Sequence, residues 1–324
     1  MQILFNVLYF TRSESDANCM NIFSAFVQLL QHNNCEVRVI ACDLLGCMFQ
    51  SKIPHNKMYA QKFEELGGVD ILFRSIDDNA TLSSSLDIVT LHGGSHAYEF
   101  VAEESLKCLS ILASSTTVSP SVTMNRILYV AKFLAHKNEK IIEKTLWFVL
   151  DAIVSIRAAA DVDANLYSYC LQVVNASLLG PVVQFIIHPN VAIASLALHC
   201  FGKMSSQRAH EVRGGSVIKK GMESVILQLK NKNPTVCASA CSCIISLASP
   251  LTENHKENCV YLHSLGSVDA LLSVLECGQE ELSRYVLLSL FAIESTSDNY
   301  LKVQNFLMGP SAAVLLKSGQ ERIL

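Results

Sequence analysis

The chain carries 12 cysteines, and three of them lie close together at Cys237, Cys241 and Cys243. Paired thiolates in a loop would suit a zinc ion, and a thiol beside a histidine would suit nucleophilic catalysis. The spacing C-x-x-x-C-x-C instead falls inside an apolar helical stretch. We therefore interpret these cysteines as small buried hydrophobic residues. The scatter of the others through apolar stretches favours a reducing compartment.

A segment rich in serine, threonine and glycine occupies about residues 78–98 and is predicted to be an inserted loop. Phosphorylation of Ser83–Ser85 would add negative charge and switch binding, although exposed serine clusters without a role are common. His92 and His96 lie on the same segment, but two histidines without a third ligand do not make a zinc site. A loop of this length is usually either functional or disordered.

The sequence contains no motif for hydrolysis, phosphoryl transfer or zinc-dependent catalysis. It has no G-x-S-x-G, no Walker loop, no kinase signature and no H-E-x-x-H. The pairs Gly93-Gly94 and Gly214-Gly215 lack the flanking strand or lysine that phosphate-binding loops require. We predict that the protein is not an enzyme and has no catalytic residue, no metal and no cofactor.

The amino-acid composition indicates which kind of secondary structure must position any functional residue. Half of the residues are hydrophobic, 17% are charged and 7% are aromatic, which suits aliphatic helices packed on one another. The formal net charge of −4 argues against nucleic-acid binding, which needs a concentrated basic surface. We expect no membrane span, because no apolar run is long enough, and a cytoplasmic location, with the nucleus as the alternative.

One pattern occurs six times along the chain. An aliphatic anchor residue is followed by a small or β-branched residue four positions later and by apolar residues at the fifth and eighth positions. Apolar residues at these offsets share one face of an α-helix of about 3.6 residues per turn. His199, Gly202 and Lys203 depart from the pattern in the fourth copy. The six anchors are Val37, Val101, Ile141, Val191, Val236 and Leu282.

The segments between the anchors have the length and punctuation of a helical solenoid. The anchor intervals are 64, 40, 50, 45 and 46 residues, which suits a unit of two or three helices with one long insertion. Glycine permits a sharp turn between a short first helix and a longer second helix. Such glycines precede most anchors, at Gly68, Gly180, Gly221, Gly266 and Gly309. Polar breaks that supply helix caps follow, at 32–36, 136–140 and 230–234.

A helix opened by glycine, a short polar break and a helix with valine, a small residue and leucine at offsets 0, 4 and 5 resembles the armadillo repeat. The resemblance covers about residues 20–316. It implies an all-α, right-handed α-solenoid of about six armadillo-like (ARM/HEAT-type) repeats, with residues 1–324 forming a single array. The HEAT repeat is the near alternative, and the glycines favour armadillo. Both ends read as incomplete repeats, so we expect a longer array or ends that pair with another molecule.

Import receptors of the armadillo family carry a tryptophan and an asparagine four residues apart on the third helix of each repeat, where they bind extended peptides. The matching positions lie six and ten residues after each anchor. The third repeat has Trp147, the only tryptophan of the chain, with Asp151 in place of asparagine. Other repeats have unrelated pairs such as Asp43 and Cys47. Without a ladder of these pairs, we do not expect binding of nuclear-localisation peptides.

The third helices of armadillo proteins line a concave groove, and the resemblance implies a protein-binding site there. An aromatic side chain among mixed charges is typical of protein interfaces. Trp147 alternatively covers the hydrophobic core between repeats, and the charges only solvate a surface. The predicted groove residues are Trp147, Asp151, Lys107, Asp43, Glu143, Arg284 and Tyr285.

The prediction is therefore a non-enzymatic interaction scaffold or adaptor that binds a segment of a partner protein along the groove. The alternative is a structural component of a larger assembly, such as a ciliary, transport or signalling complex, in which the solenoid is a spacer. The high apolar fraction indicates that part of the surface is covered in use by a partner, by further repeats or by a second copy.

Overall fold

The computed structural model describes residues 16–49, 56–85, 94–115, 119–158, 164–205, 215–249, 255–276 and 280–294. Every secondary-structure element within these ranges is a helix, and the all-α class predicted from the sequence is confirmed. The chain forms two compact units, residues 1–167 and 168–324. The predicted incomplete repeats at the two ends lie outside the described residues.

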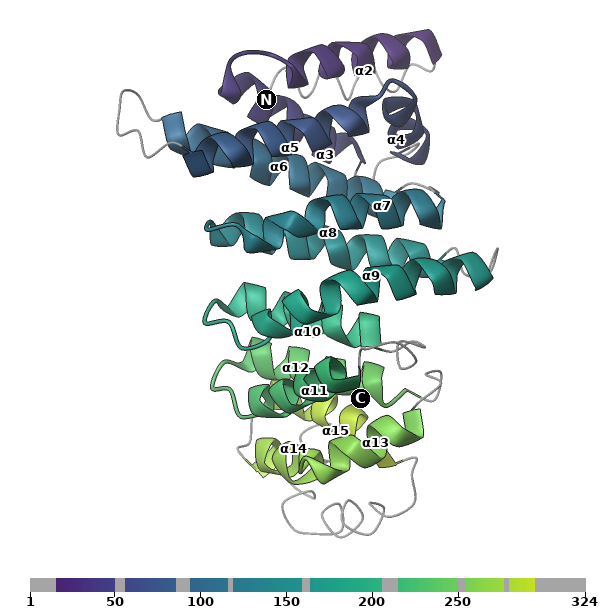
Figure 1. The fold of residues 1–324 in the computed structure, drawn as a ribbon, viewed down its shortest axis with the longest axis vertical. Coiled ribbons are helices and arrows are strands. Elements are labelled where there is room, and N and C mark those ends of the chain that lie inside the picture. The colour runs from purple at the N-terminus through teal and green to yellow at the C-terminus, as the bar shows by residue number, and fades with distance from the viewer. Residues whose placement is uncertain are drawn as a thin grey trace, which may run out of the picture. The chain divides into compact units, whose positions relative to one another are not determined.

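The first unit contains seven α-helices and one short 3-10 helix among its described residues (Figure 1). They are α2 (Asp16–Leu30), α3 (Cys35–Phe49), α4 (Asn56–Glu65), α5 (Gly68–Ser85), α6 (Gly94–Ser115), α7 (Pro120–Val130), η1 (Ala131–Ala135) and α8 (Glu139–Ala158). The helices α3, α6 and α8 contain three of the anchors, Val37, Val101 and Ile141, in their first two turns or just after them. They pack in sequence, α3 against α6 and α6 against α8.

The second unit repeats this arrangement. Its helices are α9 (Ala164–Phe185), which begins just before the boundary, α10 (Val191–Ser205), α11 (Gly215–Leu229), α12 (Pro234–Leu247), α13 (His255–Ser264), α14 (Ser267–Glu276) and α15 (Glu280–Glu294). The helices α10, α12 and α15 carry the other three anchors, and α12 packs against both of the others. All six third helices predicted from the anchors are therefore present.

The apolar residues of the repeat form the core. The residue eight positions after the anchor is fully or almost fully buried in five of the six third helices, as Leu45, Leu109, Val149, Ile244 and Leu290. The sixth is His199, which is half-buried. Burial lowers the pKa of His199, and the nearby charge of Lys203 lowers it further. The departure from the pattern thus places a titratable group where the sister helices have an aliphatic one.

The glycine turn predicted at Gly266 is confirmed, the one predicted at Gly68 is made by the preceding glycine, and two others are wrong. Gly67 and Gly266 have positive φ angles of 72° and 76° and join α4 to α5 and α13 to α14, whereas Gly68 is the first residue of α5. By contrast, α9 continues through Gly180 and α11 continues through Gly221. A Cβ atom at Gly221 would overlap the ring of Phe201 on α10, so this glycine permits close helix packing rather than a turn. Among the described residues, none lies close enough to Gly180 to explain this glycine, and Gly309 lies outside the described residues.

The inserted loop predicted at 78–98 is shorter than expected. Helix α5 continues to Ser85 and α6 begins at Gly94, so only residues 86–93 lie between the two helices, outside the described residues. Elongating an existing helix adds one hydrogen bond per residue, and serine lowers helix stability only modestly. The buried turns around Leu72 and Ile76 therefore allow α5 to extend into the serine-rich segment.

The polar breaks cap the third helices through one recurring hydrogen-bond pattern. Before α8, the backbone N–H of Asn138 donates to Nδ1 of His136 at 3.0 Å, and the Oδ1 atom of Asn138 accepts from the backbone N–H of Lys140 at 2.8 Å. The asparagine thus satisfies a helix N–H that has no partner within the helix. The same pattern occurs before α3, α10 and α12, at His32 with Asn34, His188 with Asn190, and Asn231 with Asn233.

Among the helices that the structure describes, none is by itself long and apolar enough to cross a membrane. The pair α13 and α14 reaches the required length and composition only when both helices are taken together, and it is bent by 70°.

Candidate partner-binding surface

Helix α8 presents three of the predicted residues on one stripe. Glu143, Trp147 and Asp151 are separated by four residues each, which places them one above another on the same helix face. The side chain of Trp147 is 43% exposed, so much of the indole faces solvent rather than the core. Val154, which continues the stripe, is also exposed. Trp147 is therefore available for a contact with another molecule.

Asp151 is held by the neighbouring third helix. The hydroxyl group of Ser110 on α6 donates a short hydrogen bond to the Asp151 carboxylate. Burial raises the pKa of Asp151, while the hydrogen bond from Ser110 acts in the opposite direction. The carboxylate is thereby fixed beside the indole at the α6–α8 contact. Ser110 was not predicted, although it lies nine positions after its anchor and Asp151 lies ten positions after its own.

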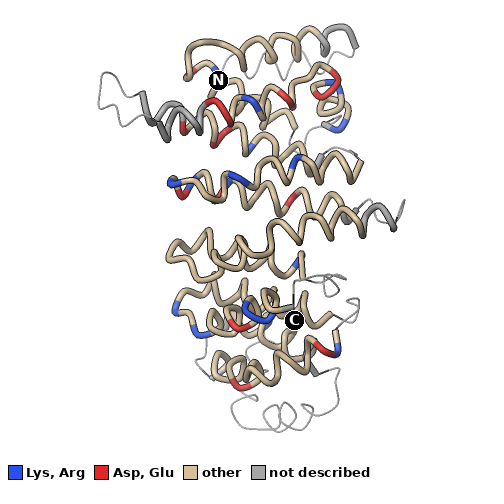
Figure 2. The backbone as a smooth tube through the Cα atoms, in the orientation of Figure 1, with Lys and Arg blue, Asp and Glu red and all other residues tan. Residues whose placement is uncertain are grey.

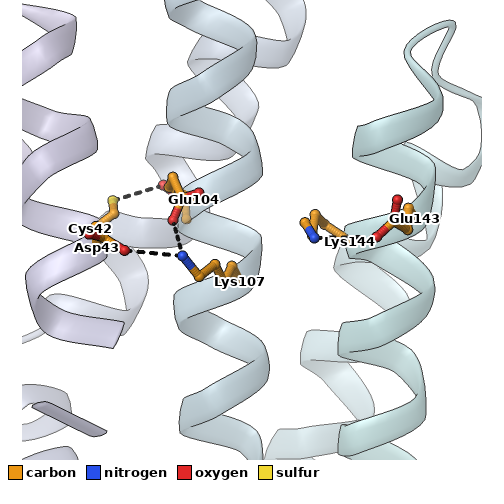
Figure 3. A network of polar contacts seen from close by, with 7 residues as sticks. Cys42, Asp43, Glu104, Lys107, Glu143 and Lys144 are labelled. Carbon is orange, nitrogen blue, oxygen red and sulfur yellow. Dashed lines mark hydrogen bonds and ion pairs between the residues drawn. The ribbon is translucent and has the colours of Figure 1, made fainter. Parts of the chain in front are cut away.

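Lys107 on α6 connects the other two third helices of this unit. Its Nζ atom lies 3.1 Å from Oδ1 of Asp43 on α3 and 2.8 Å from Oε2 of Glu104 on its own helix (Figure 3). Burial lowers the pKa of Lys107, but the hydrogen bonds to Glu104 and Asp43 outweigh that effect and the pKa is raised. Glu104 was not predicted, and its position three residues before Lys107 was the available signal.

The remaining charges near the start of α8 are partly neutralised. Glu143 lies 3.3 Å from the amine of Lys144, and Nζ of Lys140 lies 5.5 Å from the ring centroid of Phe100 on α6. Glu103 on α6 is buried, and this burial raises its pKa despite the opposing charge of Lys140. Acidic and basic groups therefore both lie near the α6–α8 contact.

Carboxylates nevertheless outnumber bases on the three third helices of this unit, which carry eight Asp and Glu residues against five Lys and Arg residues. Figure 2 shows charged residues of both signs along these helices. We call their shared surface the first-unit face. It comprises Asp43, Glu104, Lys107, Glu143, Trp147 and Asp151.

The second unit has a different third-helix surface. Helix α12 contains no charged residue. The two predicted residues of this unit, Arg284 and Tyr285, are exposed on α15, where Leu288 and Phe291 are exposed as well. The structure thus places five of the seven predicted residues on the first-unit face and two on α15. Whether any of them binds a partner stays a prediction.

The cysteine cluster has the role inferred from its spacing. Cys237, Cys241 and Cys243 are all buried in α12, and Sγ of Cys237 donates to the backbone carbonyl of Leu229 at 3.4 Å. Burial raises the pKa of the Cys243 thiol. In the part of the chain that the structure describes, no group of three or more His, Cys, Asp or Glu side chains is arranged to hold a metal.

Solved structures that are similar to this chain include engineered proteins, and several of these are described as armadillo repeat proteins. One is a designed armadillo repeat protein in complex with the peptide (KR)4, with a TM-score of 0.59, 16% sequence identity and coverage of 83% of this chain and 98% of that one. Another is a structure described as computationally designed armadillo repeat proteins for modular peptide recognition. It has a TM-score of 0.56 and 14% sequence identity, and the match covers 83% of this chain and 98% of that one. The chain has the armadillo-repeat fold.

A third similar structure is an engineered protein with a TM-score of 0.61 at 13% identity, covering 84% of this chain and 98% of that one. No protein-family model and no curated protein matches the sequence. The armadillo fold is therefore established through structure, and it confirms the resemblance carried by the anchors and their offsets.

Proposed function

We propose that the protein is a non-enzymatic scaffold whose first-unit face binds an extended segment of a partner protein. The observation that carries this proposal is the exposure of Trp147 between two carboxylates on a rigid stack of helices. Tryptophan is prominent among residues that dominate binding energy, and a preorganised surface loses little entropy when it binds. Two of the similar armadillo structures are described as peptide complexes or peptide binders, which supports the same use here.

The chemistry of the face favours a partner segment with basic side chains. Its carboxylates outnumber its bases, and complementary charge speeds association and selects among partners. Asp151 has only hydrogen-bond acceptors when ionised, and one of them is used by Ser110. It therefore lacks the amide donor with which an asparagine would bind a peptide carbonyl. Recognition of side-chain cations beside an apolar contact with Trp147 fits this arrangement better than recognition of the peptide backbone.

Affinity capture from a eukaryotic lysate tests the proposal. Wild type is compared with Trp147→Ala and with Tyr169→Ala, which removes another exposed aromatic side chain from α9. Circular dichroism first establishes that all three proteins are equally helical. Loss of specific partners from Trp147→Ala alone is the expected result. Capture of the same partners by all three proteins would show that the first-unit face is not the binding site.

The other parts of the proposal follow from the sequence. We infer an adaptor without catalytic activity or cofactor, because no catalytic motif is present and the repeat accounts for the buried cysteines. We infer a cytoplasmic location, with the nucleus as the alternative, because the cysteines are scattered through apolar helices as in proteins of reducing compartments. Fluorescence imaging of the tagged protein in cells, with fractionation as a second method, tests this location.

A further inference from the structure

The amine of Lys107 occupies the centre of the first-unit face. It lies between carboxylates from two helices, 3.1 Å from Asp43 and 2.8 Å from Glu104. The side chains are 40% exposed for Lys107, 54% for Asp43 and 23% for Glu104. Figure 3 shows the lysine reaching from α6 toward Asp43 on α3. The bridge is therefore a solvent-exposed surface contact rather than a buried one.

The position of the bridge matters because of the repeat register. Lys107, Asp43 and Trp147 each lie six positions after their anchors, so they form one row across α3, α6 and α8. A partner segment lying along this row would meet the indole of Trp147 on one side. On the other side it would meet two carboxylates already occupied by the chain's own ammonium group.

Exposed ion pairs of this kind contribute little free energy, because each charge is well solvated on its own and the side chains lose freedom when paired. The bridge is consequently weak enough to be exchanged for another cation at small cost. A partner lysine or arginine competes directly with Lys107 for the same two acceptors, and it binds less tightly than it would if both carboxylates were unoccupied.

We propose that Lys107 is an internal competitor that limits the affinity of the first-unit face for basic partner segments. This inference rests on the proposed function and adds a regulatory residue to it. Removal of the positive charge from Lys107 exposes Asp43 and Glu104 and increases the affinity for a basic segment. Acetylation of Lys107, which removes the charge and the ion pair, would act in the same direction.

The test is a fluorescence-anisotropy titration with a labelled peptide of four Lys-Arg repeats at low ionic strength, where screening is weak. Four proteins are compared: wild type, Lys107→Gln, a double variant with Asp43→Asn and Glu104→Gln, and a triple variant that carries all of these changes. Lys220→Gln, at an exposed site on α11, is the matched control for net charge. Lys107→Met serves as a second neutral variant, and thermal unfolding followed by circular dichroism monitors the fold.

The expected result is that Lys107→Gln binds the peptide about 3-fold more tightly than wild type, the size of effect that one exposed ion pair produces. The gain is expected to vanish in the background that lacks both carboxylates, and Lys220→Gln is expected to bind like wild type. The inference would be overturned if Lys107→Gln bound the peptide no more tightly than wild type, or if Lys220→Gln showed an equal gain. It would also be overturned if the gain persisted without Asp43 and Glu104, or if neither wild type nor Lys107→Gln bound the peptide. The capture experiment with Trp147→Ala tests the proposed function independently of this titration, because it uses cellular partners and leaves Lys107 in place.

Discussion

Replacement of Gly221 by alanine tests a close helix contact in the second unit, between α11 and α10. Gly221 lies within α11, and a Cβ atom there would overlap the Cζ and Cε2 atoms of Phe201. Phe201 is fully buried on α10, so its ring cannot move into solvent to relieve the overlap. Forcing an extra methyl group into a packed core typically costs about 1–3 kcal/mol. Alanine itself favours a helix over glycine by about 1 kcal/mol.

The net expectation for Gly221→Ala is a loss of up to about 2 kcal/mol in the free energy of unfolding. Gly46→Ala is the matched comparison, because a Cβ atom at Gly46 in α3 would meet only the terminal methyl group of Ile111 at 3.4 Å, an ordinary contact. This variant should be as stable as wild type or slightly more stable.

Urea denaturation followed by far-ultraviolet circular dichroism measures both variants, and the difference in transition midpoint carries the comparison. A second variant, Gly221→Ala with Phe201→Leu, makes room for the new methyl group. It should lose less stability than the two single changes added together, because residues in contact are not independent. If Gly221→Ala proved as stable as Gly46→Ala, the explanation of this glycine by close packing would be refuted.

Three further changes test individual side chains. His199→Leu should stabilise the fold below pH 6.5. Folding lowers the pKa of His199, so the unfolded chain takes up a proton more readily and the wild type loses stability as the pH falls. Denaturation of both proteins at several pH values measures the difference. Asn138→Ala should cost about 1 kcal/mol in unfolding free energy through loss of the α8 cap, whereas Asn138→Asp should retain most of it. Ser110→Ala should raise the pKa of Asp151 further by removing a hydrogen bond to its charged form, as carboxyl titration by nuclear magnetic resonance would show; an unchanged titration would contradict the contact.

Local periodicity was enough to locate the third helices. The offsets 0, 4, 5 and 8 from each anchor describe one side of a helix, and this property depends only on residues within a few turns. The same register contains part of the candidate site, since Asp43 and Lys107 both lie six positions after an anchor. Their contact spans 64 residues, which is the interval between the two anchors. The polar breaks likewise predicted helix caps. They did not predict that a histidine Nδ1 atom would accept a hydrogen bond from the backbone N–H of the capping asparagine in three of them.

Tertiary structure decided the properties that depend on neighbours from other repeats. A glycine in the sequence does not reveal whether it makes a turn, as Gly266 does, or admits an aromatic ring, as Gly221 does, because the ring comes from a different helix. The exposure of Trp147 and the hydrogen bond from Ser110 to Asp151, 41 residues apart, depend on how α6 and α8 pack. The sequence by itself determined where helices form and which side of each is apolar, since these are local; the contacts made by the opposite side were settled only when the helices were stacked.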